Sequence, residues 1–88
     1  MKVVFTNRFG RDLRRVKDRR VLQRVRDAIA NVESAANLRE IRELKKLAAV
    51  GSFYRIRIGD YRLARAIENG VVEFIRCLPR RDLYRHFP

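Results

Sequence analysis

The sequence predicts an α+β domain in which an N-terminal strand and a helical hairpin pack on an antiparallel sheet of about four strands. Three observations predict this fold class. Residues 3–5 form a short apolar run, apolar residues then recur every three to four positions, and from residue 53 onward they recur at every second position. At 88 residues the chain is expected to be a single domain, 1–88, because either half alone would be too small to form a core.

Two amphipathic helices are expected after the first strand. Thr6 and Asn7 are favourable N-cap residues, and a polar break at residues 17–20 separates the two helices. The apolar positions are Phe9, Leu13 and Val16 in the first helix, and Leu22, Val25, Ile29 and Val32 in the second. Both follow a period of about 3.6 residues, so each helix can bury one face.

A shorter third helical stretch is predicted next. Asn37 followed by Glu40 resembles a capping box. Apolar residues then continue at helical spacing toward Gly51, and they are Leu38, Ile41, Leu44 and Leu47.

Three strands are expected in the C-terminal half. Residues 53–58 and 61–68 are joined by Gly59 and Asp60, and Asn69 with Gly70 predicts a type I′ turn before residues 71–78. Pro79 ends the last strand because proline cannot donate a ladder hydrogen bond. Residues 80–87 form a charged tail or a helical turn, from which Leu83, Tyr84 and Phe87 are available to pack back.

The charge balance predicts a polyanionic partner. Twenty-two Lys and Arg against ten Asp and Glu give a net charge of +12, and the isoelectric point is near 11.4. Arginine outnumbers lysine, which favours nucleic acid because guanidinium binds phosphate in a bidentate way. A GC-rich genome is the alternative source of the arginine excess.

Several classes are excluded by simple counts. One cysteine and one histidine cannot build a zinc site or an internal disulfide, and the acidic residues are too dispersed to hold magnesium, so no metal and no cofactor are expected. No run approaches the length of a membrane span, so neither a membrane nor a signal peptide is expected. The expected location is the cytoplasm.

Counting residues across the two tight turns predicts rows of side chains on one face of the sheet. Arg57 should face Arg62, and Arg62 should face Cys77. A second row on that face should hold Arg55, Ala64 and Ile75, and the opposite face should be apolar. Facing arginines repel unless an anion lies between them, so this face is a candidate anion site, closed at its rim by Arg80 and Arg81. The alternative is an ordinary solvated face of a half-exposed sheet.

At this point the chain resembles a known family. The segment 54–63, the hairpin after it and the ending 79–88 are similar to the C-terminal half of RelE/ParE superfamily toxins, whose fold also begins with a strand and a helical hairpin. The resemblance implies a ribosome-dependent mRNA endonuclease, an mRNA interferase, held inactive by a cognate acidic antitoxin. It also implies that the metal-free chemistry is attack of an RNA 2′-hydroxyl on the neighbouring phosphate.

The resemblance assigns roles to individual residues. Arg57, Arg62, Arg81 and Tyr84 would be catalytic, while Arg55, Arg80 and Arg85 would bind RNA phosphate. Arg62 and Arg81 would hold the scissile phosphate, Arg57 would stabilise charge, and Tyr84 could stack on a base or orient the hydroxyl.

No residue of the sequence is an obvious proton acceptor for this reaction. Several related toxins carry a histidine where Pro79 stands here, and the only histidine, His86, lies in the tail, so the proton acceptor is missing. Two alternatives therefore stay open: a ParE-like inhibitor that binds DNA gyrase without catalysis, and an attenuated or inactive RNA-binding relative.

Overall fold

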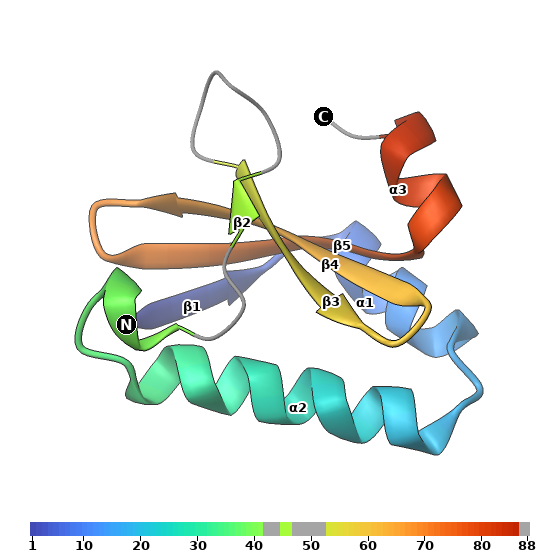
Figure 1. Ribbon diagram of the computed structural model, residues 1–88, viewed down its shortest axis with the longest axis horizontal. Coiled ribbons are helices and arrows are strands. Elements are labelled where there is room, and N and C mark those ends of the chain that lie inside the picture. Colours follow the sequence, from blue (N-terminus) through green and yellow to red (C-terminus); the bar gives the residue numbers. More distant parts are fainter. Residues whose placement is uncertain (42–44, 47–52, 87–88) are drawn as a thin grey trace.

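The computed structural model of the protein describes residues 1–41, 45–46 and 53–86. Figure 1 shows α2 running along one face of a twisted sheet, with α1 on the same side and α3 on the other. The elements in chain order are β1 (Lys2–Phe5), α1 (Asn7–Arg15), α2 (Arg19–Ser34), a 3₁₀ helix (Leu38–Glu40), β2 (Lys45–Lys46), β3 (Phe53–Ile58), β4 (Tyr61–Glu68), β5 (Val71–Pro79) and α3 (Arg80–His86). None of the described helices is long and apolar enough to cross a membrane.

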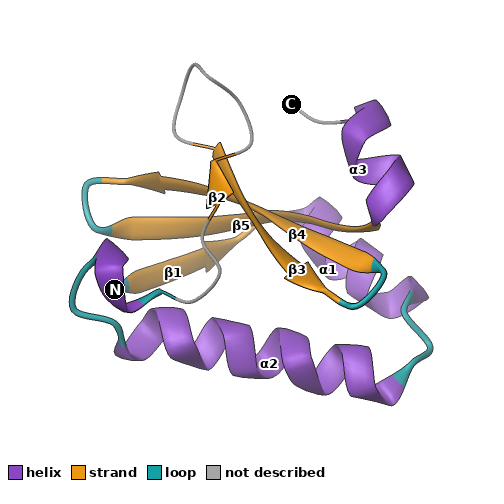
Figure 2. Cartoon of the chain, in the orientation of Figure 1, coloured by secondary structure: helices purple, strands orange, loops and turns teal. Residues whose placement is uncertain are grey.

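Within the described residues the sheet has five strands, in the order β1-β5-β4-β3-β2. The meander β3-β4-β5 is antiparallel as predicted, and Asn69 and Gly70 adopt the positive φ values of 50° and 77° that a type I′ turn requires. β1 instead pairs in parallel with β5, from Lys2 opposite Val71 to Phe5 opposite Phe74. The sheet is therefore mixed, because the helical hairpin carries the chain away from β1 before the meander returns to it (Figure 2).

The two predicted helices form, and a side chain caps each of them. Thr6 Oγ1 accepts a hydrogen bond from the amide of Phe9 at 3.1 Å. Asp18, inside the predicted polar break, accepts one from the amide of Arg20 at 2.8 Å. Both contacts satisfy a helix N–H that has no partner within its own helix.

The prediction of a third helical stretch is wrong beyond the first turn of that stretch. The 3₁₀ helix spans only Leu38–Glu40, and the Glu40 carboxylate accepts from the amide of Ala36 at 2.6 Å rather than from that of Asn37. Lys45 and Lys46 then form β2, pairing with Arg55 and Tyr54. The hydrogen-bonding edge of β3 outweighs helical periodicity here. Leu44, Leu47 and Gly51 lie outside the described residues.

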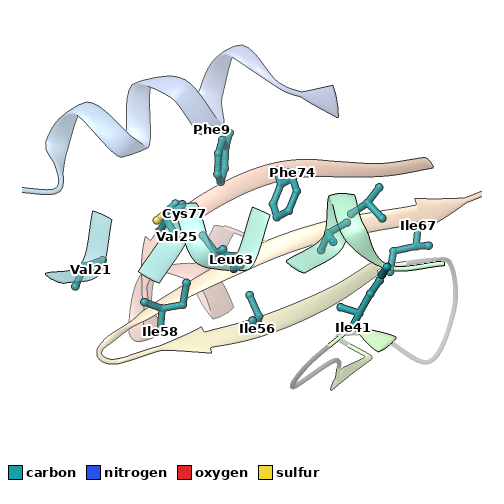
Figure 3. Packing of buried hydrophobic residues seen from close by; sticks show 14 of the residues in the cluster. Phe9, Val21, Val25, Ile41, Ile56, Ile58, Leu63, Ile67, Phe74 and Cys77 are labelled. Atoms are coloured by element: carbon teal, nitrogen blue, oxygen red, sulfur yellow. The ribbon is translucent and has the colours of Figure 1, made fainter. Parts of the chain in front are cut away.

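The main core lies between the helical hairpin and one face of the sheet (Figure 3). Val21, Val25, Ala28 and Val32 of α2 are buried there, while Leu22 and Ile29 are only half-buried at its margin. The buried residues that α1 and the strands contribute include Phe9, Ile56, Ile58, Leu63, Ile67, Val72, Phe74 and Cys77.

A smaller apolar cluster covers the other face of the sheet at one end. Leu83 of α3 is fully buried and packs with Ala64 of β4 and Leu78 of β5. The expectation that Leu83 packs back is confirmed, and Phe87 lies outside the described residues. This face is therefore not open along its whole length.

Candidate nucleic-acid interface

The predicted pairing of two arginines across β3 and β4 is confirmed. Arg57 lies opposite Arg62, and Arg55 lies opposite Ala64. The turn between the strands contains Gly59, whose φ of 55° is a conformation that glycine adopts readily. The two-residue turn thus places two guanidinium side chains in one row.

Arg62 is not open to solvent, contrary to the expected anion site. It is only 5% exposed, and its Nη1 donates hydrogen bonds to the carbonyls of Gly59 and Tyr61, both at 2.9 Å. Its partner on β5 is Leu78, and Leu83 of α3 packs against Leu78. Arg62 therefore supports the β3–β4 turn, while Arg57, its neighbour on β3, is exposed.

Cys77 does not belong to the arginine row, and that prediction was wrong. A register shift between Ala64 and Arg65 leaves Ile75 without a partner in β4, so Leu63 pairs with Cys77 and Ala64 with Arg76. One extra residue in a strand moves every later side chain to the other face, which residue counting cannot detect. The second row consequently holds Arg76 rather than Ile75.

The thiol of Cys77 is unsuited to nucleophilic chemistry. The side chain is buried in the main core, and burial, together with the nearby Asp12 carboxylate, raises its pKa to about 12. The reactive form of cysteine is the thiolate, which this environment disfavours.

Three of the remaining predicted arginines, Arg80, Arg81 and Arg85, belong to α3, which begins at one end of the sheet. The amide of Arg80 donates to the carbonyl of Asp60 at 2.8 Å, which joins the start of α3 to the β3–β4 turn. Arg81 and Arg85 lie four residues apart on α3 and are both exposed, and Arg80 is exposed as well. Arg55 is half-buried on β3. Tyr84 belongs to α3, and its side chain lies outside the described part of the structure.

A buried ion pair that sequence reasoning missed lies at the edge of β5. Asp12 of α1 accepts from Arg76 Nε at 2.8 Å and Nη2 at 3.2 Å, and also from the backbone amide of Cys77 at 3.0 Å. The hydrogen bond to Asp12 raises the pKa of Arg76. The sequence did carry one indication that Asp12 is special: it is the only acidic residue among the first 17.

The contacts of Asp12 have a structural cause. β1 ends at Phe5, so no strand among the described residues pairs with this edge of β5 beyond Phe74, while β4 continues to pair with the opposite edge. Thr6 Oγ1 donates a hydrogen bond to the carbonyl of Ile75 at 2.7 Å, and the Asp12 carboxylate accepts one from the amide of Cys77. Two side chains thus replace the missing strand and satisfy backbone groups that would be costly to bury unpaired.

Arg65 is a second charged residue that the predictions passed over. It is fully buried, and its three guanidinium nitrogens have no hydrogen-bond partner among the described residues. Its guanidinium lies 5.9 Å from the centre of the Phe74 ring, and burial lowers its pKa to about 10. The alternation of side chains along β4 places Arg65 on the apolar face, so its burial could have been predicted from the sequence.

The fold and the basic face point to a class of small basic toxins, and comparison with known proteins confirms it. Residues 3–84 match the family model described as the ParE toxin of the type II toxin-antitoxin system parDE. The chain therefore belongs to the RelE/ParE superfamily of type II toxins.

Individual relatives agree with this assignment. The chain is 30% identical over 89 residues to toxin RelE3 of Methanocaldococcus jannaschii, with all of both chains covered. It superposes with a TM-score of 0.82 and 27% identity on the structure of a RelB-RelE antitoxin-toxin complex from Methanococcus jannaschii, covering 97% of this chain and 99% of that one. An archaeal RelE-RelB complex from Pyrococcus horikoshii shares the fold, with a TM-score of 0.72, 23% identity and coverage of 90% and 93%.

Proposed function

We propose that this type II toxin is a metal-independent endoribonuclease that cleaves mRNA on the ribosome, in the cytoplasm, and so stops translation. The observation that carries this proposal is the set of exposed arginines at one end of the sheet: Arg57, Arg80, Arg81 and Arg85. None of these four arginines forms an ion pair with a described residue; the ion pair among the described residues joins Arg76 and Asp12 at the edge of β5. Such a surface suits the phosphate groups of RNA.

The roles of the arginines follow from their exposure. Both Arg57 and Arg81 are exposed; in this proposal they would contact the scissile phosphate and stabilise the charge that develops on it during attack by the 2′-hydroxyl. Arg62 is buried, so we assign it a positioning role: it holds the turn that follows Arg57. Arg55, Arg80 and Arg85 would hold the flanking phosphates.

Proton transfer is assigned to α3. The attacking hydroxyl must lose a proton, and arginine cannot accept it under ordinary conditions. α3 carries three residues that can exchange protons: Asp82, Tyr84 and His86. We propose Tyr84 as the residue that orients the hydroxyl, with His86 as the alternative acceptor.

The proposed inhibitor is an acidic antitoxin that covers this charged surface. The support is the net charge of +12 and the finding that the similar archaeal toxins were each solved in complex with RelB. An acidic chain would neutralise the arginines and compete with RNA for them.

The test is controlled expression of the wild type beside Arg57→Ala, Arg81→Ala and Tyr84→Phe, with growth recorded and mRNA 5′ ends mapped. Arg26→Ala is the matched control, because Arg26 is exposed on α2, away from α3. We expect new cuts within translated codons for the wild type and the control, and a loss of cuts for the other three variants, all of which should stay folded.

Two other outcomes would reject this function. Growth arrest with intact mRNA and an induced DNA-damage response would support the gyrase-binding alternative. A wild type that neither arrests growth nor cuts RNA would identify an inactive relative.

A further inference from the structure

We infer that α1 and β5 form a second RNA-phosphate site, in a groove lined by Arg8, Arg11, Asp12, Arg15 and Arg76. This groove lies along the edge of β5 beside α1, outside the arginines of α3 and of the β3–β4 turn. The inference deepens the proposed function and rests on it for the choice of RNA as the ligand.

Helix geometry brings three of these arginines to one side of α1. Arg8, Arg11 and Arg15 are spaced three and four residues apart, so they follow one another along a single face over about 10 Å. All three are exposed, and none of their side chains has a hydrogen bond or ion pair with a described residue. They form a row of guanidinium groups that can follow a phosphate backbone.

Arg76 completes the groove from the strand side, and Asp12 holds it there. The two carboxylate oxygens of Asp12 bind Arg76 and the amide of Cys77, so the one acidic group of the groove is already engaged. Four arginines and one aspartate leave a charge of +3 in this groove. The ion pair therefore positions Arg76 without neutralising the three arginines of α1.

The lining favours RNA over a protein partner. Each residue that lines the groove is charged, and none is apolar. Stable protein interfaces need a buried apolar or aromatic centre, whereas interfaces with nucleic acid are polar and strongly positive. An acidic segment of an antitoxin would find no apolar anchor in this groove.

The groove also leads toward the proposed catalytic end. Asp12 and Arg15 line a neighbouring pocket together with Pro79 and Asp82, at the junction of β5 and α3. The groove thus adjoins the beginning of α3, the helix that carries Arg81. The two sites would hold different phosphates of one strand.

The test measures binding of a short 2′-O-methyl RNA, which cannot be cleaved because its 2′-hydroxyl is blocked. Purified wild type is compared with the triple variant Arg8→Gln, Arg11→Gln, Arg15→Gln at several salt concentrations. The matched control removes the same charge from exposed arginines that do not line the groove, and it carries Arg14→Gln, Arg19→Gln and Arg26→Gln. Circular dichroism checks that each protein is folded.

We expect the triple variant to lose about tenfold in affinity for the RNA at moderate salt. The slope of log K against log salt should become shallower by about 2, because each of the three lost phosphate contacts contributes about 0.7 to it. The control should change both quantities far less. Equal losses in the two variants, or no RNA binding by the wild type, would overturn the inference. So would a triple variant that binds RNA normally but has lost affinity for the antitoxin.

The two proposals fail separately. If RNA binding depends on the groove but mRNA stays uncut in cells, the second site stands and the nuclease function does not. If mRNA is cut but the triple variant binds RNA like the wild type, the nuclease function stands and the second site does not.

Discussion

Asp12 and Arg76, which are 64 residues apart in the chain, form a bidentate ion pair with a shortest contact of 2.8 Å at the edge of β5. The same carboxylate accepts the amide of Cys77, so one side chain joins α1 to β5 and ends the sheet where β1 stops. A buried carboxylate with three donors is a junction whose loss should weaken the whole fold.

Asp12→Asn is therefore expected to destabilise the protein by about 2 to 4 kcal/mol, because Arg76 would lose its counter-charge in a partly buried position. Urea unfolding measures this. Glu33→Gln, at an exposed position on α2, is the control and should change stability by less than about 0.5 kcal/mol. Equal effects of the two substitutions would contradict the structural role of Asp12.

Thr6 offers a second test of the same edge. Its hydroxyl both caps α1 and donates to the carbonyl of Ile75. Thr6→Val keeps the shape but removes both hydrogen bonds, and it should cost about 1 to 2 kcal/mol in unfolding free energy. Thr6→Ser keeps the hydroxyl and should retain most of the stability; if serine proves as harmful as valine, the hydrogen bonds are not the cause.

Arg65 should be replaceable by an apolar residue with a gain in stability. Arg65→Met removes a fully buried cation without a described hydrogen-bond partner and should raise the free energy of unfolding by about 1 to 3 kcal/mol. Arg26→Met, at an exposed position, should change it little. A large loss of stability in Arg65→Met would show that the guanidinium has an essential partner in the fold.

The advantage of Arg65→Met should also depend on pH. Burial lowers the pKa of Arg65 to about 10 in the folded protein, from an ordinary value of 12.5. The charged guanidinium is thus disfavoured in the folded state; its destabilising effect is complete below pH 10 and decreases as the pH rises through 10. Melting curves of both proteins between pH 8 and 11 should converge, and parallel curves would contradict the assigned cause.

Leu83→Ala should loosen α3 from the sheet. Leu83 is fully buried against Ala64 and Leu78, so its truncation should cost about 2 to 4 kcal/mol. Leu38→Ala, at a position 41% exposed, is the control and should cost much less. Hydrogen exchange should show faster exchange in α3 and at Arg62; unchanged protection of both would show that another contact holds the helix.

Cys77 should resist thiol reagents in the folded protein. Burial and the Asp12 carboxylate raise its pKa to about 12, so little thiolate is present at pH 8. Reaction with a disulfide reagent should be slow in buffer and fast in denaturant. Rapid labelling of the folded protein would place the thiol at the surface.

Much of the fold could be read from local patterns. The switch from helical to alternating periodicity located α1, α2 and the meander, Thr6 marked the first helix cap, and Asn69 with Gly70 marked a tight turn. The pairing of Arg57 with Arg62 followed from a two-residue turn. Each of these features depends on residues close together in the chain.

The sequence by itself determined the charge of the protein, its fold class and which arginines share an end of the sheet. Only the tertiary structure decided that β1 lies parallel to β5, that a bulge moves Cys77 into the core, and that Arg62 is buried. It also decided that Asp12 meets Arg76. These outcomes depend on distant segments competing for the same hydrogen-bonding edges and the same apolar surface, and such competition leaves no local period in the sequence.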